Sequence, residues 1–194
     1  IEAGRQYDSA HPDFFDAALA AGKPDDVAAM FFTSGTTGNP KGVVHSHFTL
    51  LDRAAAGARF DKLTANEEVL AYLPPAWIGQ NIFSYAQWLV CGYVVNCPES
   101  AATVTIDLKE IGPTYYFAPP RVFENLLTQV MIRMEDAGTL KRSAFHYFMD
   151  VARRCGAEIL DRKPGISLAD RLLYALGNVL IYGPLRNVLG MSRI

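Results

Sequence analysis

The sequence is organised around one polar stretch, Thr33-Ser34-Gly35-Thr36-Thr37-Gly38-Asn39-Pro40-Lys41-Gly42. It follows an apolar run, residues 27–32, that predicts a buried strand. Its glycines let backbone N–H groups approach a ligand closely, and a concavity of N–H groups binds anions. Four hydroxyl side chains add hydrogen-bond donors and Lys41 adds a positive charge. The stretch therefore predicts a polyphosphate site, although clusters of this composition also form plain surface hairpins.

The order of residues in this stretch favours a particular kind of phosphate site. A common P-loop has Gly directly before the Lys and Ser or Thr directly after it. Here Pro40 and Gly42 flank the lysine instead. Phe32 followed by residues 33–43 resembles, at every position, the phosphate-binding signature of the adenylate-forming superfamily. That superfamily includes acyl-CoA synthetases, luciferases and the adenylation domains of peptide synthetases.

A second set of residues narrows the resemblance to the long-chain fatty-acid CoA ligase branch. Pro119-Pro120-Arg121-Val122-Phe123-Glu124 is similar to a motif of that branch, and a helical insertion with a Leu140-Lys141-Arg142 start follows it. Short-chain members and adenylation domains are usually more compact here. The resemblance covers nearly the whole chain, but only the middle of the family's large N-terminal domain.

The resemblance implies roles for the residues of the polar stretch. The residues that would bind the β- and γ-phosphates of ATP are Thr33, Ser34, Gly35, Thr36, Thr37, Gly38 and Lys41. Thr33 matches a residue that helps to position Mg²⁺. Trp77, in Leu73–Gly79, stands beside the acyl pocket, where the family usually has His. It would bind the fatty-acid substrate as an apolar wall, and the alternative is that it fills the core where a strand ends.

The implied reaction is ATP-dependent activation of a long-chain fatty acid to acyl-AMP, followed by transfer to coenzyme A. Its substrates and cofactors would be the fatty acid, ATP, Mg²⁺ and coenzyme A. The alternatives are an acyl-AMP ligase that feeds a carrier protein and a non-catalytic scaffold of the same fold. The family's adenine-binding, ribose-binding and Mg²⁺-binding Glu motifs and its catalytic Lys are absent from these 194 residues. We therefore assign no catalytic residue here and expect the isolated chain to be inactive.

Composition limits the other function classes. The chain has 194 residues, half of them hydrophobic, and a net charge of −2. That balance gives no electrostatic support for nucleic-acid binding. Three cysteines without CxxC spacing predict neither structural zinc nor disulfides, so a reducing, cytoplasmic location is expected. The oligomeric state is not determined by any feature of the sequence.

The succession of elements predicts an α/β fold. Apolar strands are expected at 27–32, 68–73, 92–97 and 114–118, with helices at 13–21, 48–60, 79–89 and 103–111. Alternation of this kind is typical of a layered, mostly parallel sheet with flanking helices. Residues 119–194 read instead as three successive helices. We therefore expect a sheet portion, 1–118, and a mainly helical insertion of the same domain, 119–194, with the family's C-terminal domain absent.

Three further features each have a functional and a structural interpretation. Arg121 begins a predicted helix, so it would bind an anion or else join the insertion to the sheet by a salt bridge. The basic face of the 141–162 helix would contact acidic lipids at the inner membrane surface, or else be a solvated face. His45 and His47 would share one face of a strand, but no third metal ligand lies nearby, which favours a structural role.

Overall fold

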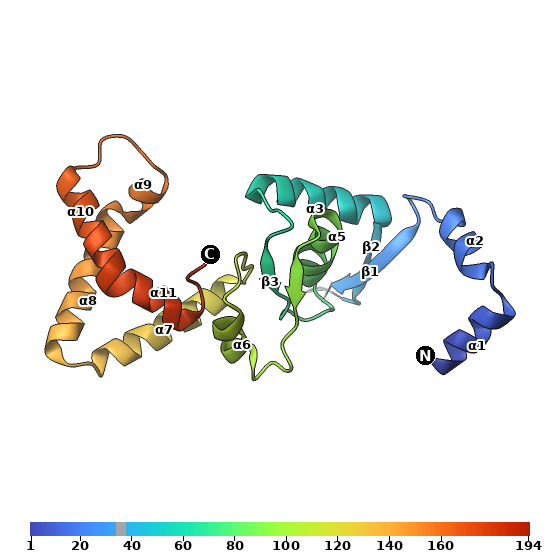
Figure 1. The fold of residues 1–194 in the computed structure, drawn as a ribbon, viewed down its shortest axis with the longest axis horizontal. Helices are drawn as coiled ribbons and strands as arrows, with labels where there is room; N and C mark the ends of the chain where they lie inside the picture. The colour runs from blue at the N-terminus through green and yellow to red at the C-terminus, as the bar shows by residue number, and fades with distance from the viewer. Residues whose placement is uncertain (34–37) are drawn as a thin grey trace. The chain divides into compact units, whose positions relative to one another are not determined.

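The computed structural model describes residues 1–33 and 38–194 (Figure 1). Most of the described residues are helical, and three segments, labelled η, are π-helical. In chain order, the elements are α1 (Glu2–Ala10), α2 (Phe14–Ala21), β1 (Val27–Thr33), β2 (Lys41–Ser46), α3 (His47–Asp61), β3 (Glu68–Leu70), α4 (Ile78–Gln80), η1 (Asn81–Ala86), α5 (Gln87–Cys91), β4 (Val94–Asn96), α6 (Val104–Ile111), α7 (Pro120–Glu135), α8 (Thr139–Val151), η2 (Ala152–Gly156), α9 (Ala157–Leu160), α10 (Leu168–Gly177), η3 (Asn178–Tyr182) and α11 (Gly183–Leu189).

The chain divides into two compact units. Unit 1 comprises Ile1–Asn66 and Leu73–Val94, and unit 2 comprises Glu67–Tyr72 and Val95–Ile194. Each is described separately below. Within the described residues, no helix is both long enough and apolar enough to cross a lipid bilayer.

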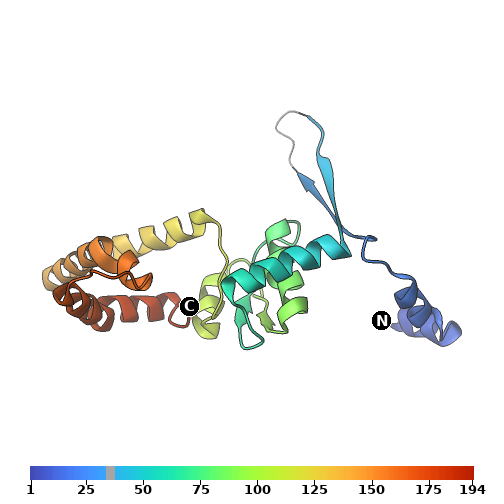
Figure 2. The same ribbon diagram turned by 90° about the horizontal axis from the view of Figure 1, so that it is seen from above.

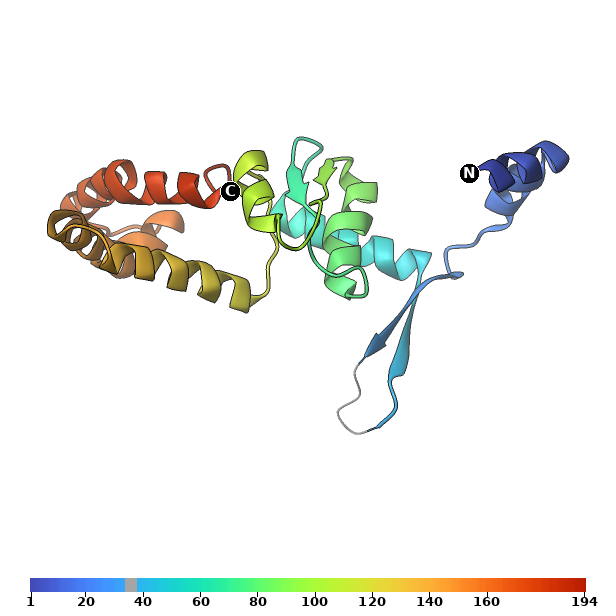
Figure 3. The ribbon, with the colours of Figure 1, turned by 90° about the horizontal axis from the view of Figure 1, so that it is seen from below.

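Unit 1 contains an antiparallel hairpin that runs directly into a helix. β1 pairs with β2 from Val27–Ser46 to Thr33–Lys41, and the hairpin projects away from α3 (Figures 2 and 3). β2 ends at Ser46 because its side chain caps α3, accepting a hydrogen bond from the Thr49 N–H at 3.2 Å. His47 is therefore the first residue of the helix. It does not continue the strand alternation that would place it on one face with His45.

The core of unit 1 lies between α3 and the η1–α5 helix. Leu50, Ala54 and Ala58 are the buried residues of α3, and their spacing places them on one face. Gly57 allows the close approach, because a Cβ there would lie 2.9 Å from the side-chain nitrogen of the buried Gln87. Small residues on α3 thus determine how closely α5 packs.

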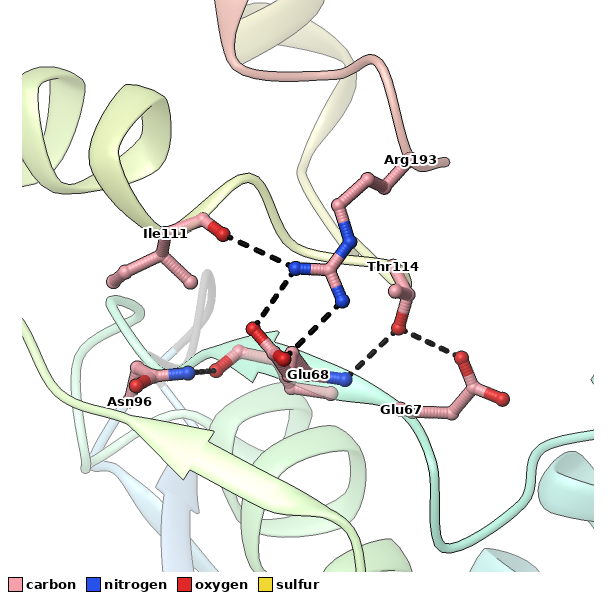
Figure 4. Close-up of polar contacts among 7 residues, drawn as sticks. Glu67, Glu68, Asn96, Ile111, Thr114 and Arg193 are labelled. Carbon is pink, nitrogen blue, oxygen red and sulfur yellow. Dashed lines mark hydrogen bonds and ion pairs between the residues drawn. The ribbon is translucent and has the colours of Figure 1, made fainter.

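Unit 2 begins with a small sheet. β3 pairs with β4, and Val69 makes a single parallel bridge to Tyr115. Thr114 accepts a hydrogen bond from the Glu68 N–H at 2.8 Å and donates one to the Glu67 carboxylate at 2.7 Å (Figure 4). These bonds fix the 112–117 segment against β3.

The helical part of unit 2 runs out along α7 and returns along α10, η3 and α11 towards α6 (Figures 2 and 3). Ser167 caps α10 by accepting a hydrogen bond from the Asp170 N–H at 3.0 Å, and its hydroxyl donates to the Asp170 carboxylate at 2.8 Å. Phe145 and Phe148 of α8 are buried in this layer. α11 ends at Gly190, where an added Cβ would lie 2.2 Å from the carbonyl oxygen of Leu108 in α6.

The α/β class and the three helical runs after residue 119 are confirmed. The expected layered sheet takes a different form: the described strands make two two-stranded sheets. The short link between β1 and β2 permits only an antiparallel pair, since a parallel pair needs a long crossover. The strand expected at 114–118 is reduced to the bridge at Tyr115.

Candidate functional site

The hairpin brings together two of the residues predicted to bind phosphate. Thr33 is the last residue of β1, Lys41 is the first of β2, and they are directly paired across the ladder. The Thr33 hydroxyl donates a hydrogen bond to the Lys41 carbonyl oxygen at 3.4 Å. Both side chains are exposed, and they flank the base of the loop between the strands. The Lys41 ammonium is thus available to an anion, while the Thr33 hydroxyl, whose single hydrogen goes to the Lys41 carbonyl, keeps its oxygen lone pairs free.

The remaining predicted phosphate ligands are only partly described. Ser34, Gly35, Thr36 and Thr37 lie outside the described residues, so their roles stay predictions. Gly38 is described, and a Cβ added there would have no heavy atom of the described residues within 4 Å. A requirement for glycine at this position would therefore fit a ligand that approaches the backbone.

The charge of Lys41 is not used within the structure. The ion pairs among the described residues do not include Lys41. Gly42, next to it, has a packing role, since a Cβ there would lie 2.9 Å from the Met30 sulfur across the hairpin. Lys41 therefore has the exposure and the free charge that a phosphate ligand needs, and Gly42 allows the strands to approach.

The residues of the hairpin also fit a magnesium ion that is held mainly by phosphate. Among residues 1–33 and 38–194, no three His, Cys, Asp or Glu side chains converge as a metal site. Mg²⁺ usually keeps several waters and binds few protein oxygens together with substrate phosphates. The exposed hydroxyl of Thr33 is an oxygen of the right kind beside the proposed phosphate site.

Trp77 lies in unit 1 at the start of a helix. It is the N-cap residue of α4, and Asn81 ties the turn together by donating to the carbonyls of Pro75 at 2.8 Å and Trp77 at 2.9 Å. The Trp77 side chain is 53% exposed. It therefore does not fill the core of this chain, and its indole face is free to contact a substrate.

Arg121 lies in the first turn of α7 in unit 2, and Pro120 begins that helix. The proline suits this position because the first N–H groups of a helix have no partner within the helix. Arg121 is exposed, and the ion pairs among the described residues do not include it. The salt bridge expected from Arg121 is thus not observed.

Another arginine makes the connection that was expected of Arg121. Arg193 binds both carboxylate oxygens of Glu68, at 3.1 and 3.2 Å, and the Ile111 carbonyl at 3.4 Å (Figure 4). This two-point contact lowers the pKa of the Glu68 carboxyl below its ordinary 4.5, through the hydrogen bonds first and the charge second. The same hydrogen bonds raise the pKa of Arg193. No local pattern signals the pair, because 125 residues separate its members.

Two tyrosines beyond β3 form a second feature that the sequence did not indicate. The rings of Tyr72 and Tyr116 stack at 5.4 Å, and the Tyr72 hydroxyl donates to the Phe117 carbonyl at 3.2 Å. Burial is the main cause that raises the pKa of both phenols. Both phenols therefore stay neutral near pH 7, and their stacked rings form a partly buried aromatic pair.

Comparison with known proteins identifies a family whose model includes the hairpin motif. A family model described as "AMP-binding enzyme" matches residues 2–184. The chain belongs to the AMP-binding enzyme family. The match extends from α1 to the start of α11, so it includes the hairpin and the helical part of unit 2.

The similar curated proteins carry the names of fatty-acid CoA ligases. A Mycobacterium tuberculosis protein named as the fatty-acid–CoA ligase fadD11 is 31% identical over 193 residues, covering 97% of this chain and 33% of its own length. The long-chain-fatty-acid–CoA ligase ACSBG2 of Xenopus laevis is 28% identical over 187 residues, covering 92% and 24%. The chain thus spans about a third or less of these relatives.

Two solved structures are also similar to parts of the chain. One is McyG A-PCP complexed with phenylalanyl-adenylate, with a TM-score of 0.49, 24% identity, and coverage of 60% of this chain and 19% of that one. The other is VinN with L-aspartate, with a TM-score of 0.48, 22% identity, and coverage of 62% and 31%. Both likenesses are too weak to indicate a substrate.

Proposed function

We propose that this chain is the phosphate-binding part of an AMP-forming fatty-acid CoA ligase. The enzyme would convert a long-chain fatty acid and ATP to acyl-AMP and pyrophosphate, and then transfer the acyl group to coenzyme A. The observation that carries the proposal is the Thr33–Lys41 pair, which sets a free ammonium and a hydroxyl at the base of a loop with the signature order. The names of the relatives support the choice of acid and acceptor.

The role proposed for the loop is electrostatic. Attack of the carboxylate on the α-phosphorus builds negative charge on the leaving pyrophosphate. N–H and hydroxyl groups of residues 33–38, with the Lys41 ammonium, are proposed to donate hydrogen bonds that stabilise that charge. Mg²⁺, when bound, would supply further positive charge at the phosphates, and Thr33 is the residue proposed to face it. No protein nucleophile is required for either step.

The residues proposed to contact substrate are thus few. Thr33, Gly38 and Lys41 are proposed phosphate ligands on described positions, and residues 34–37 complete the set. Trp77 is proposed to line the acyl pocket, and its side chain, which is 53% exposed, is accessible to a substrate. We also propose that 1–118 and 119–194 are the sheet portion and the helical insertion of one domain. Cytoplasmic location and contact with the inner membrane surface stay predictions.

The test measures products with two acceptors. The intact enzyme that contains this chain is given ATP, a long-chain fatty acid and either coenzyme A or a purified acyl carrier protein, and AMP release and thioester formation are followed. The proposal expects acid-dependent AMP release and a coenzyme A thioester. A thioester formed only on the carrier protein would replace the proposal by the carrier-dependent ligase. Nucleotide binding without AMP release would indicate a non-catalytic scaffold.

The acyl-pocket role of Trp77 has its own test. Trp77→Ala should shift the chain length at which kcat/KM is greatest, while the dependence on ATP concentration stays unchanged. Trp88→Ala, at a residue with 41% exposure on α5, is the matched control. An unchanged length profile in an active Trp77→Ala enzyme would remove Trp77 from the pocket.

A further inference from the structure

The helical part of unit 2 encloses a cavity that the proposed adenylation does not use. Its volume is about 340 Å³, and residues of α6, α7, α8, η3 and α11 line it. Its buried wall includes Val130, which is 8% exposed, and Phe145, which is 2% exposed. Cavities of this size fall within the range of small-molecule sites, about 300–1,000 Å³. The lining is mostly apolar, so the interior suits a hydrocarbon chain.

Three cations line the same cavity on its exposed side. Lys109 of α6, Arg133 of α7 and Lys141 of α8 are all exposed, and no acidic residue joins them in the lining. The ion pairs among the described residues include none of the three. Three separate helices thus contribute free positive charge to one cavity.

Three other arginines of the helical part pair with carboxylates. Arg142 pairs with Glu135 at 3.6 Å, and Arg154 pairs with Asp170 at 2.6 Å. Arg153 of η2 likewise pairs with Asp150 of α8, at 2.9 Å. The three cations that line the cavity have no such partner among the described residues, which favours a discrete anionic ligand there.

We propose that this cavity binds a single-chain amphiphile with an anionic head group. The hydrocarbon chain lies against Val130 and Phe145, and the head group contacts Lys109, Arg133 and Lys141. If a methylene group occupies about as much space as a liquid water molecule, about 30 Å³, the cavity holds roughly ten of them. A carboxylate and a phosphate monoester share this chemistry. The proposal concerns binding alone and does not rest on the proposed adenylation.

The first experiment measures binding to the full 194-residue chain by calorimetry. The probes are laurate, dodecyl phosphate and dodecanol, each below its micelle concentration. Laurate or dodecyl phosphate should bind at least tenfold more tightly than dodecanol, and the tighter of the two identifies the head group. Affinity should rise roughly fourfold for each CH₂ added between eight and twelve carbons. Equal affinity for all three probes, or binding only to anionic vesicles, would overturn the proposal.

Two variants locate the ligand. Val188→Trp fills the cavity from a lining position that is 51% exposed, whereas Val179→Trp makes the same change at a position that does not line it and is 70% exposed. Laurate binding should fall at least tenfold in the first variant and stay unchanged in the second. Equal affinities in the two variants would place the ligand elsewhere.

A third variant tests the head-group contacts. Replacement of Lys109, Arg133 and Lys141 together by Gln should weaken laurate binding about tenfold or more and leave dodecanol binding unchanged. A twelve-carbon acid with a terminal diazirine provides a measurement that needs no variant. After illumination, its cross-links should map to α7, α8 or α11, and cross-links confined to unit 1 would refute the site.

Discussion

Replacement of Lys41 by Ala separates the role of this residue in the fold from its role in catalysis. The Lys41 side chain is exposed and belongs to none of the ion pairs among the described residues, while its backbone carbonyl accepts the Thr33 hydroxyl at 3.4 Å. The substitution removes only the charged side chain and leaves that backbone contact. We therefore expect the free energy of unfolding to change by less than about 0.5 kcal/mol.

The effect on catalysis should be much larger. A hydrogen bond to a charged group contributes about 1.5–3 kcal/mol, which corresponds to roughly 10- to 150-fold in rate. Pyrophosphate is present only in the first half-reaction. Adenylation should therefore slow by this factor in Lys41→Ala, whereas thioester formation from supplied acyl-AMP should keep its rate.

The assay compares ATP–pyrophosphate exchange with single-turnover thioester formation from acyl-AMP, in the wild type and in Lys41→Ala. Lys23→Ala is the matched control, because Lys23 is an exposed lysine of unit 1 whose hydrogen bonds come from its backbone: its N–H donates to the Asp26 carboxylate at 2.7 Å, and its carbonyl accepts from the Asp26 N–H at 3.0 Å. The control should behave as the wild type in both assays. Equal slowing of the two half-reactions by Lys41→Ala would refute the assignment of Lys41 to the pyrophosphate.

Three other predictions concern the glycines and the ion pair. Gly38→Ala should change the free energy of unfolding by less than about 0.5 kcal/mol, because a Cβ there meets no described atom within 4 Å. The same variant should slow pyrophosphate exchange at least about tenfold if phosphate approaches this backbone. Arg193→Gln should destabilise the protein near neutral pH. The difference from wild type should shrink as pH falls below 4.5, because the pKa of the Glu68 carboxyl is lowered only in the folded protein and the ion pair is lost when this carboxyl is protonated; a pH-independent difference in urea unfolding would contradict this. Gly190→Ala should lower the free energy of unfolding in urea by on the order of 1–3 kcal/mol, because its φ of +75° suits glycine and the new Cβ would lie 2.2 Å from the Leu108 carbonyl oxygen. An unchanged free energy of unfolding would contradict this packing.

The elements that the sequence predicted well are those with a strong local signal. The helix at 48–60 appears as α3, one residue longer at each end, and the helix expected from 103 to 111 appears as α6. The strand expected at 27–32 appears as β1, one residue longer, although most of its residues are exposed rather than buried. In these cases periodicity and capping determine the structure without help from distant residues.

The features that were missed depend on distant contacts or lack an apolar pattern. α1 (Glu2–Ala10) was not among the helices expected from the sequence, because it has no apolar stripe, and none of its residues is buried in the structure. The pairing of Glu68 with Arg193 joins positions 125 residues apart. The cavity needs five helical segments to be placed together. Periodicity describes one element at a time, so it cannot predict such arrangements.

The candidate site was predictable from the order of its residues, but its geometry was not. The motif indicated that Thr33 and Lys41 act together, and the ladder shows that they are directly paired. That Trp77 is half exposed rather than a core residue could not be read from its position after two prolines. The exposure of a side chain depends on what packs against it, which the sequence alone does not specify.

The loop that joins Thr33 to Lys41 is proposed to hold the pyrophosphate of ATP during the activation of a fatty acid. The most direct measurement is the exchange of radiolabelled pyrophosphate into ATP by the wild-type enzyme, with and without a long-chain fatty acid and without coenzyme A. We predict exchange that appears only when the fatty acid is present. Acid-dependent ATP cleavage that releases ADP and phosphate, with no exchange of pyrophosphate, would contradict the account.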